Sequence, residues 1–209
     1  MSRAPSPVIT TGAPGSAANW PVFAVAAVLT LAALGAYWNS FNVPLLLDDK
    51  SAISDNSSIR HLERIGDVLS PPPTGATAAR PLLNLSFALD YAGGGLSVRG
   101  YHAGNLLIHI CAGLALLGIV RRTLLWPRLR HRYGDAALPL AAAAALLWTL
   151  HPLQTESVTY ISQRAESLMG LFYLLTLYCF IRSDVGRGRR TPPDCPPNAA
   201  AFGDPANDN

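Results

Sequence analysis

Four apolar stretches alternate with polar segments along the chain. Residues 20–38 carry no charged side chain, begin and end with tryptophan, and could cross about 30 Å of hydrocarbon as an α-helix. A second apolar stretch, 101–120, stops at two arginines, whereas 136–150 and 168–181 reach spanning length only with their neighbours. The pattern predicts an all-α, polytopic membrane helix bundle with about four transmembrane helices. A hydrophobic pair of helices inside a larger bundle is the alternative for the last two stretches.

The long polar segment 39–100 has helical signals of its own. Apolar and charged residues alternate at helical spacing over 57–69, and three prolines at 71–73 end that pattern. A second helix is predicted to begin at Arg80 and Pro81 and to end at the glycines 93–95. Its large apolar side chains suit a helix that lies on a membrane surface, so we expect a helical loop.

Arginines predict the orientation in the membrane. Five lie between residues 121 and 132, and four lie between 182 and 190. The positive-inside rule places both groups in the cytoplasm, together with both termini. Residues 39–100 and 151–167 then form the two outer loops.

Composition supports this class and excludes others. Half of the 209 residues are hydrophobic and 14% are charged, whereas soluble domains carry about 25% charged residues. Of the 16 basic residues 15 are arginines, and most lie beside apolar runs, so a lipid bilayer and no nucleic acid is the expected partner. Three cysteines are too few for a disulfide scaffold. The arginine- and alanine-rich composition is typical of a GC-rich bacterial genome. Together with the predicted spans, it makes a bacterial inner membrane the expected location.

The two ends of the chain differ from the apolar core region. Residues 1–19 and 183–209 are rich in proline, glycine and small or polar residues. Such segments bury too little apolar surface to fold, so a disordered arm and a disordered tail are predicted around a membrane domain at 20–182.

Asp48 and Asp49 follow the first apolar stretch by about ten residues. Two adjacent carboxylates can supply a general base where burial raises one pKa, or can hold a divalent cation. From spacing alone, a solvated turn or a helix N-cap explains such a pair more often.

Three polar residues share one face of the second apolar stretch: His102, Asn105 and His109. Polar groups inside a span face the protein interior or a watery cavity. They either serve a function, for example in a small transporter or channel, or join helices by hydrogen bonds. No third ligand stands at a spacing typical of zinc.

A second polar block opens with His151 and continues through Glu156, Tyr160 and Arg164. If the block is helical, the last three share a face. Arg164 would then lie close to an apolar segment, where a phosphate or carboxylate partner is expected. The alternative is an ion pair between Glu156 and Arg164 that only stabilises the loop.

These segments together resemble one family. The resemblance rests on Arg80-Pro81-Leu82, Phe87-Ala88-Leu89-Asp90-Tyr91, Gly100-Tyr101-His102, Asn105-Leu106-Leu107 with His109, and above all the continuous block 151–162 with Arg164. Over roughly residues 37–181 the chain resembles the transmembrane and tetratricopeptide-repeat O-mannosyltransferase-like family, including its bacterial relatives.

The resemblance implies a GT-C type glycosyltransferase. Such an enzyme would move a sugar, a mannose-type hexose, from a polyprenyl-phosphate carrier to a protein hydroxyl with inversion. The family's acidic pair carries over onto Asp48 and Asp49 as catalytic residues. Its polar block carries over onto substrate-binding residues His151, Glu156 and Arg164. Arg80 and His102 are further substrate-binding candidates.

The chain departs from the family in length. Family members have many more spans followed by tetratricopeptide repeats, whereas this sequence offers four apolar stretches and no repeat. The expectation is therefore an N-terminal part of such an enzyme, truncated or split, with a second chain supplying further helices. The alternative is a non-catalytic membrane interaction protein or a remnant of the enzyme.

Overall fold

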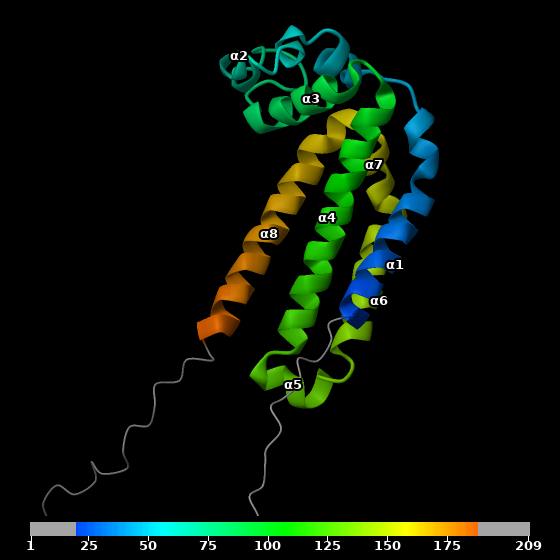
Figure 1. Ribbon diagram of the computed structural model, residues 1–209, viewed down its shortest axis with the longest axis vertical. Coiled ribbons are helices and arrows are strands. Elements are labelled where there is room, and N and C mark those ends of the chain that lie inside the picture. The colour runs from blue at the N-terminus through cyan, green and yellow to red at the C-terminus, as the bar shows by residue number, and fades with distance from the viewer. Residues whose placement is uncertain (1–19, 188–209) are drawn as a thin grey trace, which may run out of the picture.

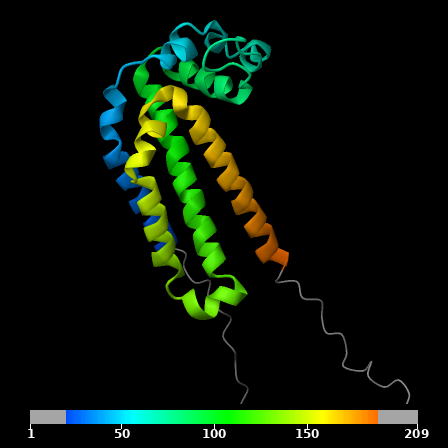
Figure 2. The same cartoon turned by 180° about the vertical axis from the view of Figure 1, so that it is seen from behind.

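The computed structural model describes residues 20–187, and its side chains as far as residue 183. Every regular element within this range is helical, and the chain is an all-α membrane helix bundle. Four helices lie side by side as a stem: α1 (Trp20–Ala36), α4 (Val98–Leu124), α6 (Ala137–Thr149) and α8 (Arg164–Arg187) (Figure 1). A cap of shorter helices covers one end of the stem, and α5 (Pro127–Tyr133) lies at the other end, as the reverse view also shows (Figure 2).

Two stem helices are long and apolar enough to cross a membrane. They are α4 and the stretch Ile161–Ser183, which contains most of α8. A third span arises if α6 and the segment Pro152–Thr159, bent by 52° against it, are taken as one broken helix. The helix α1 is apolar but has 17 residues. The structure thus supports two or three of the four predicted spans by length and composition.

The stem helices extend differently from the predicted stretches. The fourth stretch, predicted as 168–181, lies inside a helix that starts four residues earlier, at Arg164. Because this helix continues to Arg187, the predicted disordered tail does not begin at residue 183. The disorder predicted for residues 1–19 and 188–209 lies outside the described residues.

The cap contains η1 (Trp38–Asn42), η2 (Lys50–Ser54), η3 (Ser57–Arg60), α2 (Ile65–Leu69) and α3 (Pro81–Gly94). The predicted helix at the Arg80-Pro81 start is confirmed as α3, with Pro81 in its first turn. Gly95 ends this helix with a φ of 60°, which glycine adopts without a steric penalty.

The single helix predicted over 57–69 is wrong, because the segment breaks into η3 and α2. The buried side chain of Asn84 explains the break. Its amide nitrogen donates to the hydroxyl of Ser58 at 2.9 Å and to the carbonyl of Val68 at 2.7 Å, and its oxygen accepts from Asn56 at 2.7 Å. A continuous helix would carry Ser58 and Val68 apart and leave this buried amide without partners, which costs more than one broken helical turn.

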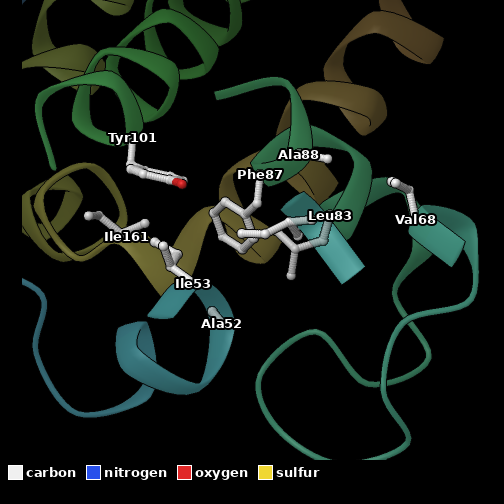
Figure 3. Packing of buried hydrophobic residues seen from close by; sticks show 9 residues of the cluster. Ala52, Ile53, Val68, Leu83, Phe87, Ala88, Tyr101 and Ile161 are labelled. Atoms are coloured by element: carbon white, nitrogen blue, oxygen red, sulfur yellow. The ribbon is translucent and has the colours of Figure 1, made fainter. Parts of the chain in front are cut away.

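A shared hydrophobic core joins the cap to the stem. Phe87 and Leu83 of α3 pack with Ala52, Ile53, Ile59 and Val68 of the cap. Tyr101 of α4 and Ile161 complete the cluster from the stem side, and the Phe87 and Tyr101 rings lie 6.1 Å apart (Figure 3). Because both halves contribute fully buried side chains, the cap is fixed over the ends of α4 and α8.

Candidate functional site

The acidic pair lies in a tight turn between η1 and η2. The backbone N–H of Asp49 donates to the carbonyl of Leu46 at 2.8 Å, and the N–H of Leu46 donates to Asp49 Oδ2 at 3.1 Å. Leu47 between them has a φ of 38°, a left-handed conformation that a branched side chain rarely adopts. Strain of this kind persists only where the surrounding contacts enforce it, and it is found most often at functional sites.

The two carboxylates have different environments. Asp49 is 2% exposed, and its Oδ1 accepts the backbone N–H of Ser162 at 2.7 Å. Both of its oxygens therefore receive a backbone donor. Asp48 is exposed, and its own backbone N–H donates to the hydroxyl of Tyr160 at 3.4 Å. The segment 160–162 thus fixes the turn, and Asp48 holds the carboxylate that faces solvent.

Arg164 is the largest fully buried side chain in the described part of the protein, at 1% exposure. Its Nη1 lies 2.6 Å from Oδ2 of Asp90 on α3, and its Nε donates to Asn105 Oδ1 on α4 at 2.6 Å. Its Nη2 donates to the carbonyl of Tyr101 at 2.7 Å, and the guanidinium lies 4.6 Å from the centre of the Phe87 ring. Three helices therefore meet at one guanidinium. Figure 3 shows two of the core residues that contact it, Tyr101 and Phe87.

The expected carboxylate partner of Arg164 is thus present, but it is Asp90 rather than Glu156. The prediction that Glu156, Tyr160 and Arg164 share one helical face is wrong. The helix α7 (Thr155–Thr159) stops before Tyr160, whose ψ of 114° is extended. Residues 161–163 form a short 3-10 turn before α8 begins. This break leaves Glu156 exposed while it turns Arg164 into the core.

Two residues of this arrangement were not predicted as site residues: Asp90, which forms the ion pair, and Gly104, which packs against it. Burial raises the pKa of the Asp90 carboxyl, and the charge of Arg164 acts in the opposite direction with a smaller effect. Gly104 of α4 provides the space for the pair, since a Cβ there would lie 2.7 Å from Arg164 Nη2 and 2.9 Å from Asp90 Oδ2. The only sequence signal for either residue was its place in or beside the blocks that carry the family resemblance.

The polar face of α4 joins this helix to α6 and to two connecting segments by hydrogen bonds. His102 Nε2 lies 3.0 Å from the carbonyl of Val43, and His109 Nε2 lies 2.9 Å from the carbonyl of Thr149. Asn105 donates to the carbonyl of Tyr160 at 3.2 Å. This is the helix-joining alternative of the sequence analysis, and it accounts for one ring nitrogen of each histidine. Nδ1 of His102 is buried and has no partner among the described residues.

The remaining predicted residues are exposed. His151 accepts the backbone N–H of Leu153 through Nδ1 at 3.2 Å and caps a short turn. Arg80 donates to the carbonyl of Ala76 at 3.4 Å and borders a groove of about 290 Å³ between α3 and α8. The groove is lined mainly by apolar side chains, including Leu82, Met169 and Phe172.

A second, smaller cavity lies on the other side of the start of α8. It measures about 200 Å³ and is lined by His109, Gln154, Ser157 and other residues, whereas Asp48 and Asp49 do not border it. Glu166 lines both this cavity and the Arg80 groove. Within residues 20–183, no group of three histidine, cysteine, aspartate or glutamate side chains is placed to hold a metal ion.

Comparison with known proteins shows a consistent set of relatives. The chain is 30% identical over 159 residues to protein O-mannosyl-transferase Tmtc1 of Drosophila melanogaster, covering 72% of this chain and 17% of that protein. It is 33% identical over 160 residues to protein O-mannosyl-transferase tmtc2 of Xenopus laevis, covering 73% of this chain and 18% of that protein. It is 29% identical over 174 residues to human protein O-mannosyl-transferase TMTC4, covering 76% of this chain and 23% of that protein.

The chain spans about a fifth of the length of the curated relatives that it matches. No protein-family model matches the sequence, and no solved structure matches it significantly.

Proposed function

Because the chain is a relative of the protein O-mannosyl-transferases over about three quarters of its length, we propose that it supplies the acidic-pair part of a membrane glycosyltransferase. The proposed reaction moves a mannose-type hexose from a polyprenyl-phosphate carrier to a protein hydroxyl, by the inverting chemistry of GT-C enzymes. The proposed location is a bacterial inner membrane, with the cap on the outer side and both chain ends in the cytoplasm.

The different environments of the two carboxylates carry the proposal. Inverting transfer needs one base that removes the proton from the attacking hydroxyl. The oxygens of Asp49 are both occupied by backbone donors, so Asp49 is proposed to position the turn. Asp48 is exposed and its backbone is held by Tyr160, so Asp48 is proposed as the base.

The Arg80 groove is the proposed site for the carrier lipid. A polyprenyl chain is apolar, and the groove presents apolar side chains of α3 and α8. The leaving phosphate needs a positive charge or hydrogen-bond donors, and the guanidinium of Arg80 borders the same groove. Arg164, enclosed by protein groups, is proposed to position α8 rather than to bind the phosphate.

Three further residues remain proposed substrate-binding residues: His102, His151 and Glu156. Nδ1 of His102 lacks a partner but is buried, and the other two are exposed beside the turn that leads to α8. A divalent cation at the acidic pair would use Asp48 together with ligands from a substrate or from further helices.

One surface supports a contribution from further helices. Only 6% of the most apolar 18-residue segment within Ile161–Ser183 is buried. Phe172, Tyr173 and Phe180 are exposed on it. A second chain or further helices packed there would enclose the Arg80 groove. The same exposed surface favours the second candidate function, a non-catalytic membrane interaction protein that binds another helical protein through α8.

The donor site is tested by binding. Purified full-length chain in detergent is titrated with polyprenyl-phosphate mannose, using the wild type, Arg80→Gln and the control Arg60→Gln. Arg60 is an exposed arginine of the same cap outside the groove. The proposal expects saturable binding that only Arg80→Gln weakens. Absence of binding, or an equal loss in both variants, contradicts the donor site and favours the interaction protein.

The base is tested by sugar transfer to protein hydroxyls in membranes that contain labelled polyprenyl-phosphate mannose and the chain co-expressed with the further helices that complete it. Asp48→Asn is expected to lower the transfer rate by roughly 10²–10⁴-fold, the usual contribution of a general base, without changing donor affinity or the melting temperature. Asp49→Asn is expected to lower both the rate and the melting temperature. Asp55→Asn, an exposed carboxylate of the same cap, is the matched control. Undiminished transfer by the double Asp48→Asn, Asp49→Asn variant would overturn the assignment.

A further inference from the structure

A separate cavity lies at the opposite end of the stem from the acidic pair. It measures about 580 Å³ and lies between α1, α4 and α8. This volume is within the roughly 300–1,000 Å³ range of ligand sites in proteins. Most of its lining is apolar, with Phe23 from α1, Leu114 from α4 and Leu175 from α8.

The lining of this cavity becomes positively charged at the end of α4. Arg121 and Arg122 border the same cavity, in the last turn of α4. Arg122 Nη2 donates to the hydroxyl of Tyr178 at 3.2 Å, and its guanidinium lies 5.1 Å from the centre of the Tyr178 ring. Contact with α8 therefore fixes the direction of one arginine along the wall of the cavity.

The approach of Tyr178 depends on a glycine. A Cβ at Gly118 of α4 would lie 2.6 Å from Cε2 of Tyr178, so only glycine allows this close packing. The arrangement thus brings together a small residue, an aromatic ring and a guanidinium on two helices. It places positive charge at the end of an apolar cavity.

The two arginines, Arg121 and Arg122, form no ion pair among the side chains that the structure describes, because neither has a carboxylate within 4.0 Å. A guanidinium keeps its charge and forms paired hydrogen bonds with phosphate oxygens. An apolar cavity that ends in two such groups matches one class of molecule, a lipid with an anionic headgroup.

We propose that this cavity binds an anionic phospholipid, with an acyl chain between α1, α4 and α8 and the headgroup phosphate at Arg121 and Arg122. The site lies apart from the Arg80 groove and does not depend on glycosyl transfer. A lipid bound there would fix the spacing between α1 and α8, because both helices line this cavity together with α4.

The test is lipid binding to the full-length chain in detergent, measured by native mass spectrometry with added phosphatidylglycerol or phosphatidylcholine. An arginine near an anionic lipid contributes about fivefold to affinity, so Arg121→Gln, Arg122→Gln should weaken phosphatidylglycerol binding roughly 25-fold. Phosphatidylcholine has the same phosphate but no net charge, so its binding should fall much less. Tyr178→Phe, which removes only the acceptor of Arg122, should cause a smaller loss.

The matched control is Arg128→Gln, Arg130→Gln. Both arginines are exposed on α5, outside the cavity, and their removal changes the net charge by the same amount. If the control weakens phosphatidylglycerol binding as much as the Arg121 and Arg122 variant does, or if the wild type does not prefer phosphatidylglycerol, the proposal is overturned. Circular dichroism of each variant shows whether the fold is retained, and Tyr178→Phe tests the site where a double variant fails to fold.

Discussion

Replacement of Gly104 by alanine should destabilise the junction of cap and stem. The added methyl group would lie 2.7 Å from Arg164 Nη2 and 2.9 Å from Asp90 Oδ2, closer than any unstrained contact. The guanidinium cannot move freely, because it is 1% exposed and is held by Asn105 and by the carbonyl of Tyr101. The carboxylate of Asp90 is held by its ion pair with this guanidinium. The ion pair must therefore shift or the helices must separate.

The expected magnitude follows from two opposing effects. Overpacking of a tight core costs about 1–3 kcal/mol, and the fixed guanidinium favours the upper part of that range. Alanine in a helix interior gains about 1 kcal/mol over glycine. The net loss of unfolding free energy is then about 1–2 kcal/mol, or about 2–8 °C in melting temperature for a chain of this size.

Gly35→Ala on α1 provides the matched control. It is the same substitution in a stem helix, and a Cβ there would meet nothing within 4 Å. Thermal unfolding of the purified chain in detergent, followed by circular dichroism, should show Gly35→Ala unchanged or slightly stabilised and Gly104→Ala destabilised. If both variants melted at the same temperature, the close packing of Gly104 against the ion pair would be refuted.

Three further results are expected. Arg164→Lys should lower the unfolding free energy by about 3 kcal/mol in the same melting assay, because an ammonium group cannot satisfy four partners in the directions of a guanidinium. A wild-type melting temperature would contradict this. Asn84→Ala should cost about 1–3 kcal/mol by leaving buried polar groups of the cap without a partner, and limited proteolysis should then cut the cap faster than the stem; equal cleavage rates would argue against it. Reporter fusions should place Ser54 and Thr159 on one side of the membrane and Arg130 on the other, and a common location of all three would reject the proposed orientation.

Local signals explain the parts of the fold that could be predicted. The helix α3 has a proline in its first turn and a glycine with positive φ at its end, and both act within a few residues of the chain. The segment 57–69 shows where local reasoning failed. Its apolar residues have helical spacing, which favours one continuous helix. The hydrogen bonds that Asn84 of α3 forms with this segment stabilise the broken form more.

The candidate site, like the fold, could be predicted from the sequence only in part. The chemistry expected at Arg164, a carboxylate partner, followed from the cost of an unpaired guanidinium near an apolar segment. The identity of that partner did not, because Asp90 reaches Arg164 only through the packing of α3 across α4 and α8. Likewise, the sequence alone does not distinguish Asp48 from Asp49, since burial of one carboxylate is decided by Ser162 in a distant segment.

The contact between Asp49 and Ser162 also determines when the acidic turn can form. These residues are separated by 113 positions, so the turn lacks this donor until almost the whole described chain has been synthesised and inserted. Contacts of such long sequence separation form late in folding. The exposed carboxylate of Asp48 would therefore reach its final position only after the segment that leads into α8 has packed against the acidic turn. Formation of the site would thus follow assembly of the membrane helices.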